Sequence, residues 1–222
     1  MSILHKLFVG LLLVAVMTSP LMVMAQDEDD EMMEVDTSDW VEFESEDGIY
    51  KLLYPPDWFV EATEDGGLVI ANSESLLETF ESEEPAESGE KVIAVFALLP
   101  ADLLALMGIQ LEDDADAKDL ITAMAELMTG EDAEDDDTEL GETDVLVLSD
   151  ESEIGVIEVS SEENQFEGYF LAYESAEGIL ALGLVAAHTG EFDEEFVALA
   201  TAVLENIEIN ITVEELMETM SG

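Results

Sequence analysis

The near absence of basic side chains is the feature that most constrains how this chain can fold. The 222 residues include 57 Asp and Glu but only 4 Lys and Arg, which gives a formal net charge of −53 at pH 7. Ion pairs therefore cannot hold the fold together, and the repulsion between carboxylates has to be screened by salt or by bound cations. The chain also has no cysteine, so disulfides cannot replace an apolar core.

The composition nevertheless allows a substantial apolar core. Hydrophobic residues make up 48% of the chain and aromatic residues 7%, whereas a disordered acidic chain combines its charge with low hydrophobicity. The length suits one ordinary domain. We therefore expect a folded domain with acidic loops and a strongly acidic surface of the kind that suits a saline environment.

The charge also excludes two classes of partner. The phosphate backbone of a nucleic acid would be repelled, and an anionic membrane surface would be repelled in the same way. Inorganic cations are the expected counterions. The expected macromolecular partner is an extracellular or envelope protein, whose identity the sequence does not give.

The N-terminus has the parts of a secretory signal peptide. Lys6 precedes an apolar run from Leu7 to Val16, and Ala25 offers a small residue before a cleavage point. This predicts a signal peptide over residues 1–25, an acidic flexible lead over 26–37, and a secreted protein, extracellular or periplasmic. The alternative is an uncleaved membrane anchor, against which Pro20 and the polar pair before it count.

Hydrophobic periodicity predicts one domain over residues 38–211, followed by a C-terminal tail over 212–222 that contains a short helix. The expected strands are 40–45, 49–54, 59–62, 68–71, 92–99, 144–148, 154–159, 166–173 and 179–187. The expected helices are 75–80 with a capping box from Ser75 to Glu78, a helix with Pro100 in its first turn, 116–130 with Asp116 as its cap, and 191–209.

This order of elements predicts the α+β class. Short connections between the later strands favour antiparallel pairing. We expect a single twisted antiparallel sheet of about 6–9 strands, flanked by helices on one or both faces. The run 179–187 is apolar on both faces, so it should be a central strand.

A proline-rich corner separates two of the strands. The segment from Tyr54 to Trp58 reads YPPDW, and it follows a strand in which Tyr50 and Leu52 share one face. Proline cannot donate to a strand ladder, so the corner should end this strand and direct the chain into the next one. We expect Trp58 to anchor the bend in the core, and Lys51 to be a strand residue at the solvent edge.

These residues resemble the PsbP-like family, in which an early strand leads into a Tyr-Pro-x-x-Trp corner. Tyr54, Pro55 and Trp58 match this motif, and residues 191–209 are similar to the family's closing helix and strand. As architecture the resemblance spans residues 38–210 and implies the family's α+β fold. Its members include extrinsic subunits of photosystem II, a Ran-binding factor and secreted bacterial proteins of unassigned role. No functional residue carries over, and the basic residues with which the plant proteins dock are almost absent here.

His188 is the one histidine that follows the predicted signal peptide. It could act as a base, or as a metal ligand with Glu191. The alternative interpretation is that His188 has only a structural place at the junction between a strand and a helix. The sequence has no GxSxG motif and no cysteine that could serve as a nucleophile. A carboxylate-pair hydrolase stays open, and two buried carboxylates facing each other in a cleft would support it.

Two acidic runs are candidate cation sites, because calcium prefers clustered oxygen ligands. Neither run has the EF-hand spacing, so loose calcium binding is the hypothesis and a solvated loop is the alternative. The candidate ligands are Asp113, Asp114, Asp116, Asp132, Glu134, Asp135, Asp136 and Asp137. No other cofactor is predicted.

The leading functional hypothesis is a secreted, non-enzymatic PsbP-like binding or accessory domain with a strongly acidic, salt-adapted surface. A calcium-binding protein is the second hypothesis, and a carboxylate-based hydrolase is the third.

Overall fold

The computed structural model describes residues 35–63, 66–79, 85–106, 109, 115–128, 138–175 and 178–221. The predicted signal peptide and residues 26–34 of the predicted acidic lead lie outside this part of the chain. Among the residues that the structure describes, no helix is both long and apolar enough to span a bilayer.

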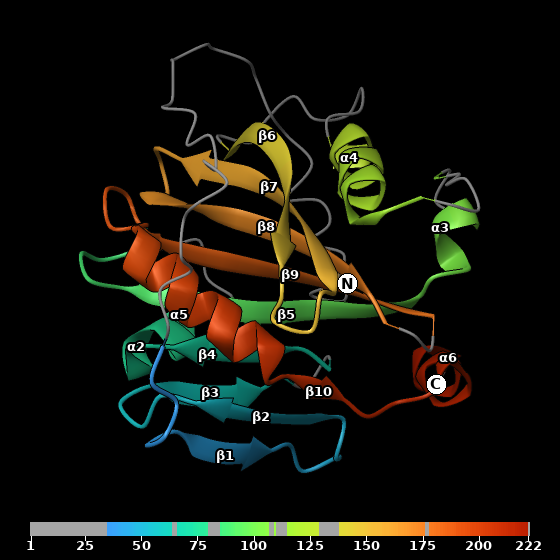
Figure 1. The fold of residues 1–222 in the computed structure, drawn as a ribbon, viewed down its shortest axis with the longest axis horizontal. Helices are drawn as coiled ribbons and strands as arrows, with labels where there is room; N and C mark the ends of the chain where they lie inside the picture. The colour runs from blue at the N-terminus through green and yellow to red at the C-terminus, as the bar shows by residue number, and fades with distance from the viewer. Residues whose placement is uncertain are drawn as a thin grey trace.

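A large antiparallel sheet forms the centre of the domain (Figure 1). Its seven strands, in spatial order, are β3 (Phe59–Ala62), β4 (Leu68–Ala71), β5 (Lys91–Pro100), β9 (Ile179–His188), β8 (Phe166–Glu174), β7 (Glu153–Ser161) and β6 (Thr138–Val147). Strand β9 is the middle strand of the seven, which confirms the prediction made from its apolar run. The predicted α+β class and antiparallel pairing are confirmed as well.

A second, smaller sheet lies beside the large one. It consists of β1 (Val41–Glu44), β2 (Tyr50–Tyr54) and β10 (Glu208–Ile209), with β2 in the middle. The expectation of a single sheet is therefore corrected. The second sheet forms because β2 pairs with β1 before it and with β10 from the far end of the chain.

The proline corner carries the chain from the small sheet to the large one. Pairing with β1 ends at Tyr54, directly before Pro55, and the Trp58 N–H donates to the Pro55 carbonyl across 3.0 Å. This hydrogen bond closes a tight turn, after which the chain enters β3 in the other sheet. The ring of Trp58 stacks on that of Phe196 with centroids 6.1 Å apart, so the predicted role of Trp58 as an anchor is confirmed.

Lys51 lies on the middle strand of the small sheet instead of at an edge. Its partners in the register are Glu44 and Glu208, and its ammonium group lies 3.4 Å from the Glu42 carboxylate. Three acidic residues therefore surround one of the few cations in the chain. This arrangement explains Lys51 as a local counter-charge.

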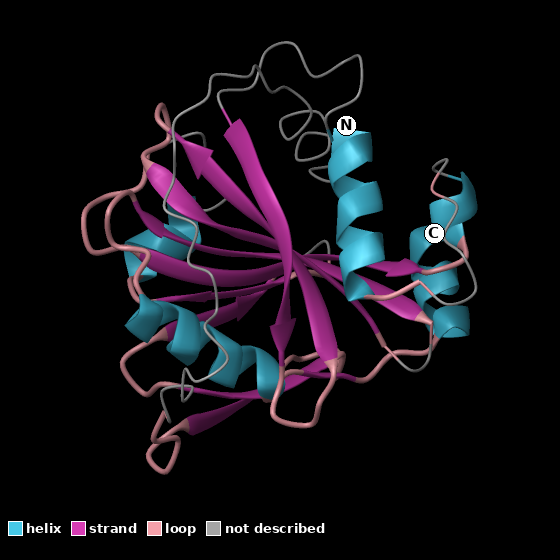
Figure 2. Cartoon of the chain, turned by 45° about the horizontal axis from the view of Figure 1, so that its top comes forward, coloured by secondary structure: helices cyan, strands magenta, loops and turns pink. Residues whose placement is uncertain are grey.

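Helices cover both faces of the large sheet (Figures 1 and 2). One face packs against α5 (Glu194–Glu205) and the small sheet, and the other packs against α2 (Glu74–Thr79), α3 (Leu103–Leu106) and α4 (Ala117–Met128). The last helix, α6 (Val213–Ser221), contributes Leu216 to the core on the α5 side. Successive residues of β9 belong to opposite cores, as the alternation of a strand requires.

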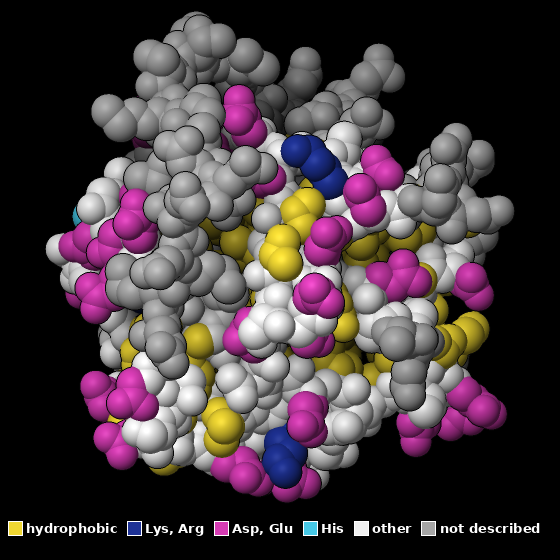
Figure 3. All heavy atoms as spheres, viewed as in Figure 1, with side chains coloured by type: hydrophobic (Ala, Val, Ile, Leu, Met, Phe, Trp, Pro, Cys, Tyr) yellow, Lys and Arg dark blue, Asp and Glu magenta, His cyan; other side chains and the backbone are white. Residues whose placement is uncertain are grey.

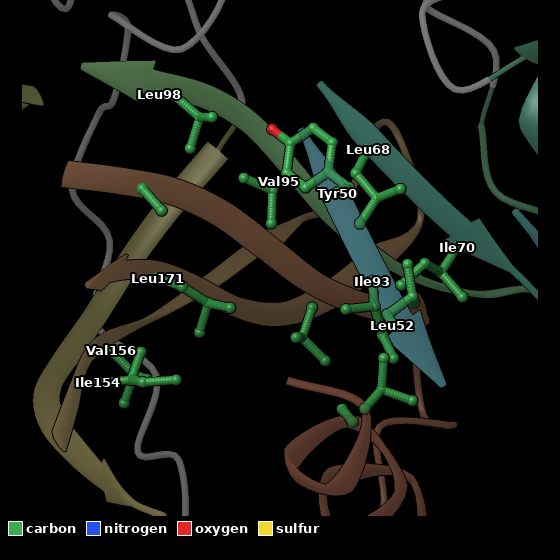
Figure 4. Close-up of a cluster of buried hydrophobic side chains, with 14 of the residues drawn as sticks. Tyr50, Leu52, Leu68, Ile70, Ile93, Val95, Leu98, Ile154, Val156 and Leu171 are labelled. Carbon is green, nitrogen blue, oxygen red and sulfur yellow. The ribbon is translucent and has the colours of Figure 1, made fainter. Parts of the chain in front are cut away.

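The two sheets share a core. Figure 4 shows Tyr50 and Leu52 of β2 directed toward Leu68, Ile93 and Val95 of the large sheet. The side chains of Tyr50 and Leu52 are 1% and 2% exposed, which confirms the face predicted for them. The Tyr50 hydroxyl also donates to the Gly66 carbonyl across 2.8 Å, so a hydrogen bond reinforces the apolar contact.

Three boundaries differ from the prediction. Helix α2 is capped by Ser73, whose hydroxyl accepts from the Leu76 N–H at 3.1 Å, and Ser75 lies inside the helix. Pro100 is the last residue of β5 and does not start a helix. A proline is tolerated there because β4 pairs with β5 only as far as Val95, so position 100 needs no N–H group on the side of β5 that faces β4. Strand β6 begins at Thr138, before the predicted start at residue 144. The prediction missed these first residues because a bulge after Leu140 interrupts the alternation of the strand.

The other predicted helices are found near their expected bounds. Asp116 caps α4, since the Asp119 N–H donates to its carboxylate across 2.9 Å. The short helix predicted in the C-terminal tail is α6, and a capping box of Thr212 and Glu215 begins it. The predicted helix over 191–209 is divided into α5, which Asp193 caps, and strand β10.

Candidate functional site: a cleft beside helix α5

A cleft of about 290 Å³ opens between the large sheet and the C-terminal end of α5. Its floor consists of sheet residues on the α5 side: Val95, Ile154, Leu171, Ala181 and Gly183. Its rim comes from the β6–β7 hairpin, the end of α5, the segment leading to β10, and the end of β8: Leu148, Asp150, Ser152, Leu204, Glu205, Ile207, Ile209, Tyr173 and Ser175. We call this feature the α5 cleft.

Gly183 explains why the floor is open at this point. A Cβ atom at position 183 would lie 2.5 Å from the Ala94 carbonyl oxygen, so the close approach of β5 and β9 requires glycine here. The register between these strands also shifts between Val95 and Ala97. As a result, no side chain rises from this position of the floor.

The β6–β7 hairpin supplies the first carboxylate of the rim. The Leu148 N–H donates to the Ser152 carbonyl and closes the turn, while Glu151 adopts a positive φ of 67°. The Asp150 carboxylate accepts from the Ser152 hydroxyl at 2.6 Å and from the Ser152 N–H at 3.0 Å. These two hydrogen bonds lower the pKa of Asp150, because they favour its charged form.

Glu205 supplies the second carboxylate. It lies in the last turn of α5, and it accepts a hydrogen bond from the Ser149 N–H at 2.6 Å, which ties the hairpin to the helix. The last turn of α5 has no basic residue. The C-terminal end of a helix carries partial negative charge, so a carboxylate there is disfavoured and a cation would be favoured.

The cleft therefore combines an apolar floor with an anionic mouth. Figure 3 views the molecule from the α5 side and shows exposed hydrophobic side chains in the middle, with Asp and Glu side chains and a basic side chain next to them. Such a surface can bind an apolar group that carries a cation or hydrogen-bond donors. It would repel an anionic ligand.

The hydroxyl groups of the rim are not arranged for nucleophilic attack. Ser152 donates to Asp150, and Ser175 accepts from the Ile179 N–H at 3.3 Å. His188 is the last residue of β9, whereas the cleft is lined by residues 181–183 of that strand. The structure therefore does not bring His188 to these serines.

His188 and Glu191 lie at the turn between β9 and α5. The Glu191 carboxylate accepts from the Ser88 hydroxyl at 2.8 Å and from the Gly89 N–H, and these bonds lower its pKa, with smaller contributions from His188 and Lys91. The Nδ1 atom of His188 is buried and has no hydrogen-bond partner among the described residues. Glu191 thus connects two loops, as expected for a structural junction.

The predicted calcium ligands fall almost entirely outside the described residues. Asp116 is the exception, and its carboxylate caps α4. Asp113, Asp114, Asp132, Glu134, Asp135, Asp136 and Asp137 lie outside the described ranges. Within those ranges no group of three or more His, Asp or Glu side chains could hold a metal ion. Calcium binding stays a prediction.

The hydrolase hypothesis required two buried carboxylates. In the described part of the chain the buried polar side chains are Ser45, Thr138 and Ser161, so no described Asp or Glu is buried. The described residues therefore provide no such pair.

The sequence did not lead us to the α5 cleft. One signal was present: Gly183 interrupts an otherwise apolar strand, and an isolated glycine in a strand often marks a close approach of two backbones. The rim could not be inferred, since it joins segments that are distant in sequence.

Comparisons with known proteins give matches in structure alone. No protein-family model and no curated protein matches the chain. The solution structure of cyanobacterial PsbP (CyanoP) from Synechocystis sp. PCC 6803 matches with a TM-score of 0.46 and 15% identity, covering 77% of this chain and 92% of that one. A variant of the protein Mog1 matches with a TM-score of 0.38 and 12% identity, covering 82% and 91%.

Proposed function

We propose that this chain is a secreted, non-enzymatic PsbP-like domain that binds a partner protein outside the cell through the α5 cleft. The observation that carries the proposal is the cleft itself, in which apolar sheet residues lie open beneath a rim of mixed polar and apolar groups. Concave, mostly apolar surfaces with a few convergent polar groups are the usual form of binding sites.

The hydrogen bonds of the polar groups in the cleft support a binding function and not a catalytic one. Both rim serines already make hydrogen bonds to neighbouring groups of the fold, and the histidine that could serve as their base lies at the end of β9. Nucleophilic catalysis needs a base within hydrogen-bonding distance of the nucleophile.

The charge of the chain supports an extracellular partner that is not anionic. The whole chain has a formal net charge of −53, so the protein attracts cationic surfaces and repels acidic ones at long range, and salt screens both effects. The N-terminal pattern of Lys6, apolar run and Ala25 supports export, and the Tyr54–Trp58 motif supports the PsbP-like assignment.

A substitution that fills the cleft tests this proposal. Ala181 lies on the floor and is 8% exposed, so Ala181→Leu adds a branched side chain to open space. The matched control is Ala62→Leu, which makes the same change on the edge strand β3 away from the cleft. We expect the wild-type protein and the control to retain one identified envelope or secreted protein as a stoichiometric complex in size-exclusion chromatography, and Ala181→Leu to lose it.

Two results would overturn the proposal. Equal retention of that partner by Ala181→Leu, in a folded state verified by circular dichroism, would show that the cleft is not the binding site. Hydrolytic turnover that His188→Ala abolishes would show that the domain is an enzyme.

A further inference from the structure

We propose that the α5 cleft recognises a basic–aromatic peptide segment, in which one large apolar side chain enters the cleft and an adjacent Lys or Arg meets the carboxylates of Asp150 and Glu205. This inference rests on the proposed function and specifies the chemistry of the partner.

The size of the cleft favours a single side chain. Its volume of about 290 Å³ lies at the lower limit of roughly 300–1,000 Å³ that is usual for small-molecule sites. One aromatic side chain fits within this volume and would contact Val95, Leu171 and Ala181 on the floor. Buried aromatic anchors of this kind dominate the energy of many protein interfaces.

The two carboxylates set the charge of the neighbouring residue. Asp150 and Glu205 line the same cleft from the hairpin and from the helix, and a carboxylate that accepts one or two hydrogen bonds still has acceptor positions free. The C-terminal end of α5 adds partial negative charge beside Glu205. Lys and Arg suit this mouth because their apolar stems can follow the rim while the charged group reaches the carboxylates.

The polar atoms of the rim favour a peptide. Ser152, Ser175 and Tyr173 line the cleft, and a hydroxyl that already makes one hydrogen bond can still accept from a peptide N–H. A second copy of this chain is a poor occupant, since residues 26–222 contain three lysines, of which Lys51 and Lys91 already pair with Glu42 and Asp193.

Calorimetric titration of residues 26–222 with three short peptides tests the inference. The first peptide is Ser-Lys-Trp-Lys-Ser, the second is Ser-Lys-Ser-Lys-Ser, and the third is Ser-Glu-Trp-Glu-Ser, all with blocked termini. We expect the first to bind at least about tenfold more tightly than either of the others. The second peptide measures the unspecific attraction of any cation to this acidic protein.

Matched variants separate the cleft from the general charge. Asp150 and Asp47 are both hairpin aspartates that accept hydrogen bonds from a serine hydroxyl and from a backbone N–H. Asp150→Asn and Asp47→Asn therefore remove the same charge from the same kind of turn. We expect Asp150→Asn to weaken binding of the first peptide about tenfold, Glu205→Gln to do the same, and Asp47→Asn to leave it within about twofold.

The outcomes also distinguish this inference from the proposed function. Equal binding of the first two peptides, tight binding of the acidic peptide, or equal effects of Asp150→Asn and Asp47→Asn would overturn the basic–aromatic assignment. The proposed function is overturned separately, when Ala181→Leu retains the natural partner. If Ala181→Leu loses the natural partner but the three peptides bind equally, the α5 cleft is still the binding site and the basic–aromatic chemistry assigned to it is wrong.

Discussion

At the scale of single residues, the described carboxylates find partners mainly among hydroxyls and backbone N–H groups. The described residues contain two lysine–carboxylate pairs, Lys51–Glu42 and Lys91–Asp193. Asp47, Asp150, Glu191 and Glu215 instead accept hydrogen bonds from serine, threonine and main-chain donors, and in each case these bonds lower the pKa. Neutral donors thus stabilise charges for which the sequence provides no cation.

Glu191 makes this effect measurable. Its folded-state pKa is lowered, so its bonds to Ser88 and Gly89 contribute stability that is present above its unfolded-state pKa and lost as the pH falls through the folded value. We expect Glu191→Gln to have a lower urea midpoint than the wild type at pH 7, and this difference to shrink below about pH 4. Glu162→Gln, at an exposed turn residue, is the control and should change little at either pH.

At the scale of elements, the approach of α4 to the sheet depends on one missing side chain. A Cβ atom at Gly155 of β7 would collide with the Ala117 carbonyl oxygen and the Ile121 side chain of α4. Ile121 and Met124 are buried beneath this contact, at 0% and 2% exposure. The core on this face can therefore close because position 155 is glycine.

Gly155→Ala should force α4 away from β7. Overpacking of this kind typically costs about 1–3 kcal/mol of unfolding free energy, which urea denaturation followed by circular dichroism would measure. Thr122→Ala, on the exposed side of α4, is the control and should remain within about 0.5 kcal/mol of the wild type. An unchanged midpoint for Gly155→Ala would mean that the helix can shift at no cost.

Local patterns in the sequence predicted most elements but not their assembly. Alternation located β2, a continuous apolar run located β9, and apolar residues at helical spacing located α4, because burial imposes such patterns on strands and helices. The bulge in β6 hid its first residues, since an extra residue breaks the alternation. The division into two sheets and the rim of the α5 cleft depend on pairings between distant segments, which no local pattern encodes.

At the scale of the whole molecule, repulsion between carboxylates opposes the apolar core. The formal net charge is −53, while the core contains buried residues from both sheets and from α3 to α6. Salt weakens the repulsion, because the Debye length falls from about 10 Å at 0.1 M to about 3 Å at 1 M. Stability should therefore depend on the medium more strongly than in a protein with balanced charge.

We expect the melting temperature to rise steadily between about 0.1 M and 1 M sodium chloride. Calcium tests the predicted acidic site in the same experiment. At equal ionic strength, additional stabilisation by calcium that Asp132→Asn and Asp136→Asn reduce would support specific binding. Equal melting temperatures in sodium and calcium would mean that calcium acts only by screening the carboxylates. A melting temperature that does not depend on salt would contradict the destabilising role assigned to carboxylate repulsion.

The pairing of β10 with β2 determines when synthesis can yield the finished fold. Ile209 lies opposite Tyr50 and Glu208 opposite Lys51, so the small sheet joins the first strands of the domain to the last one. Contacts between such distant segments form slowly, because a long loop has to close first. A chain still emerging from the ribosome cannot complete this sheet until residue 209 is free. The topology thereby leaves the middle strand of the small sheet with one of its two neighbours missing while residues 55–207 are being synthesised.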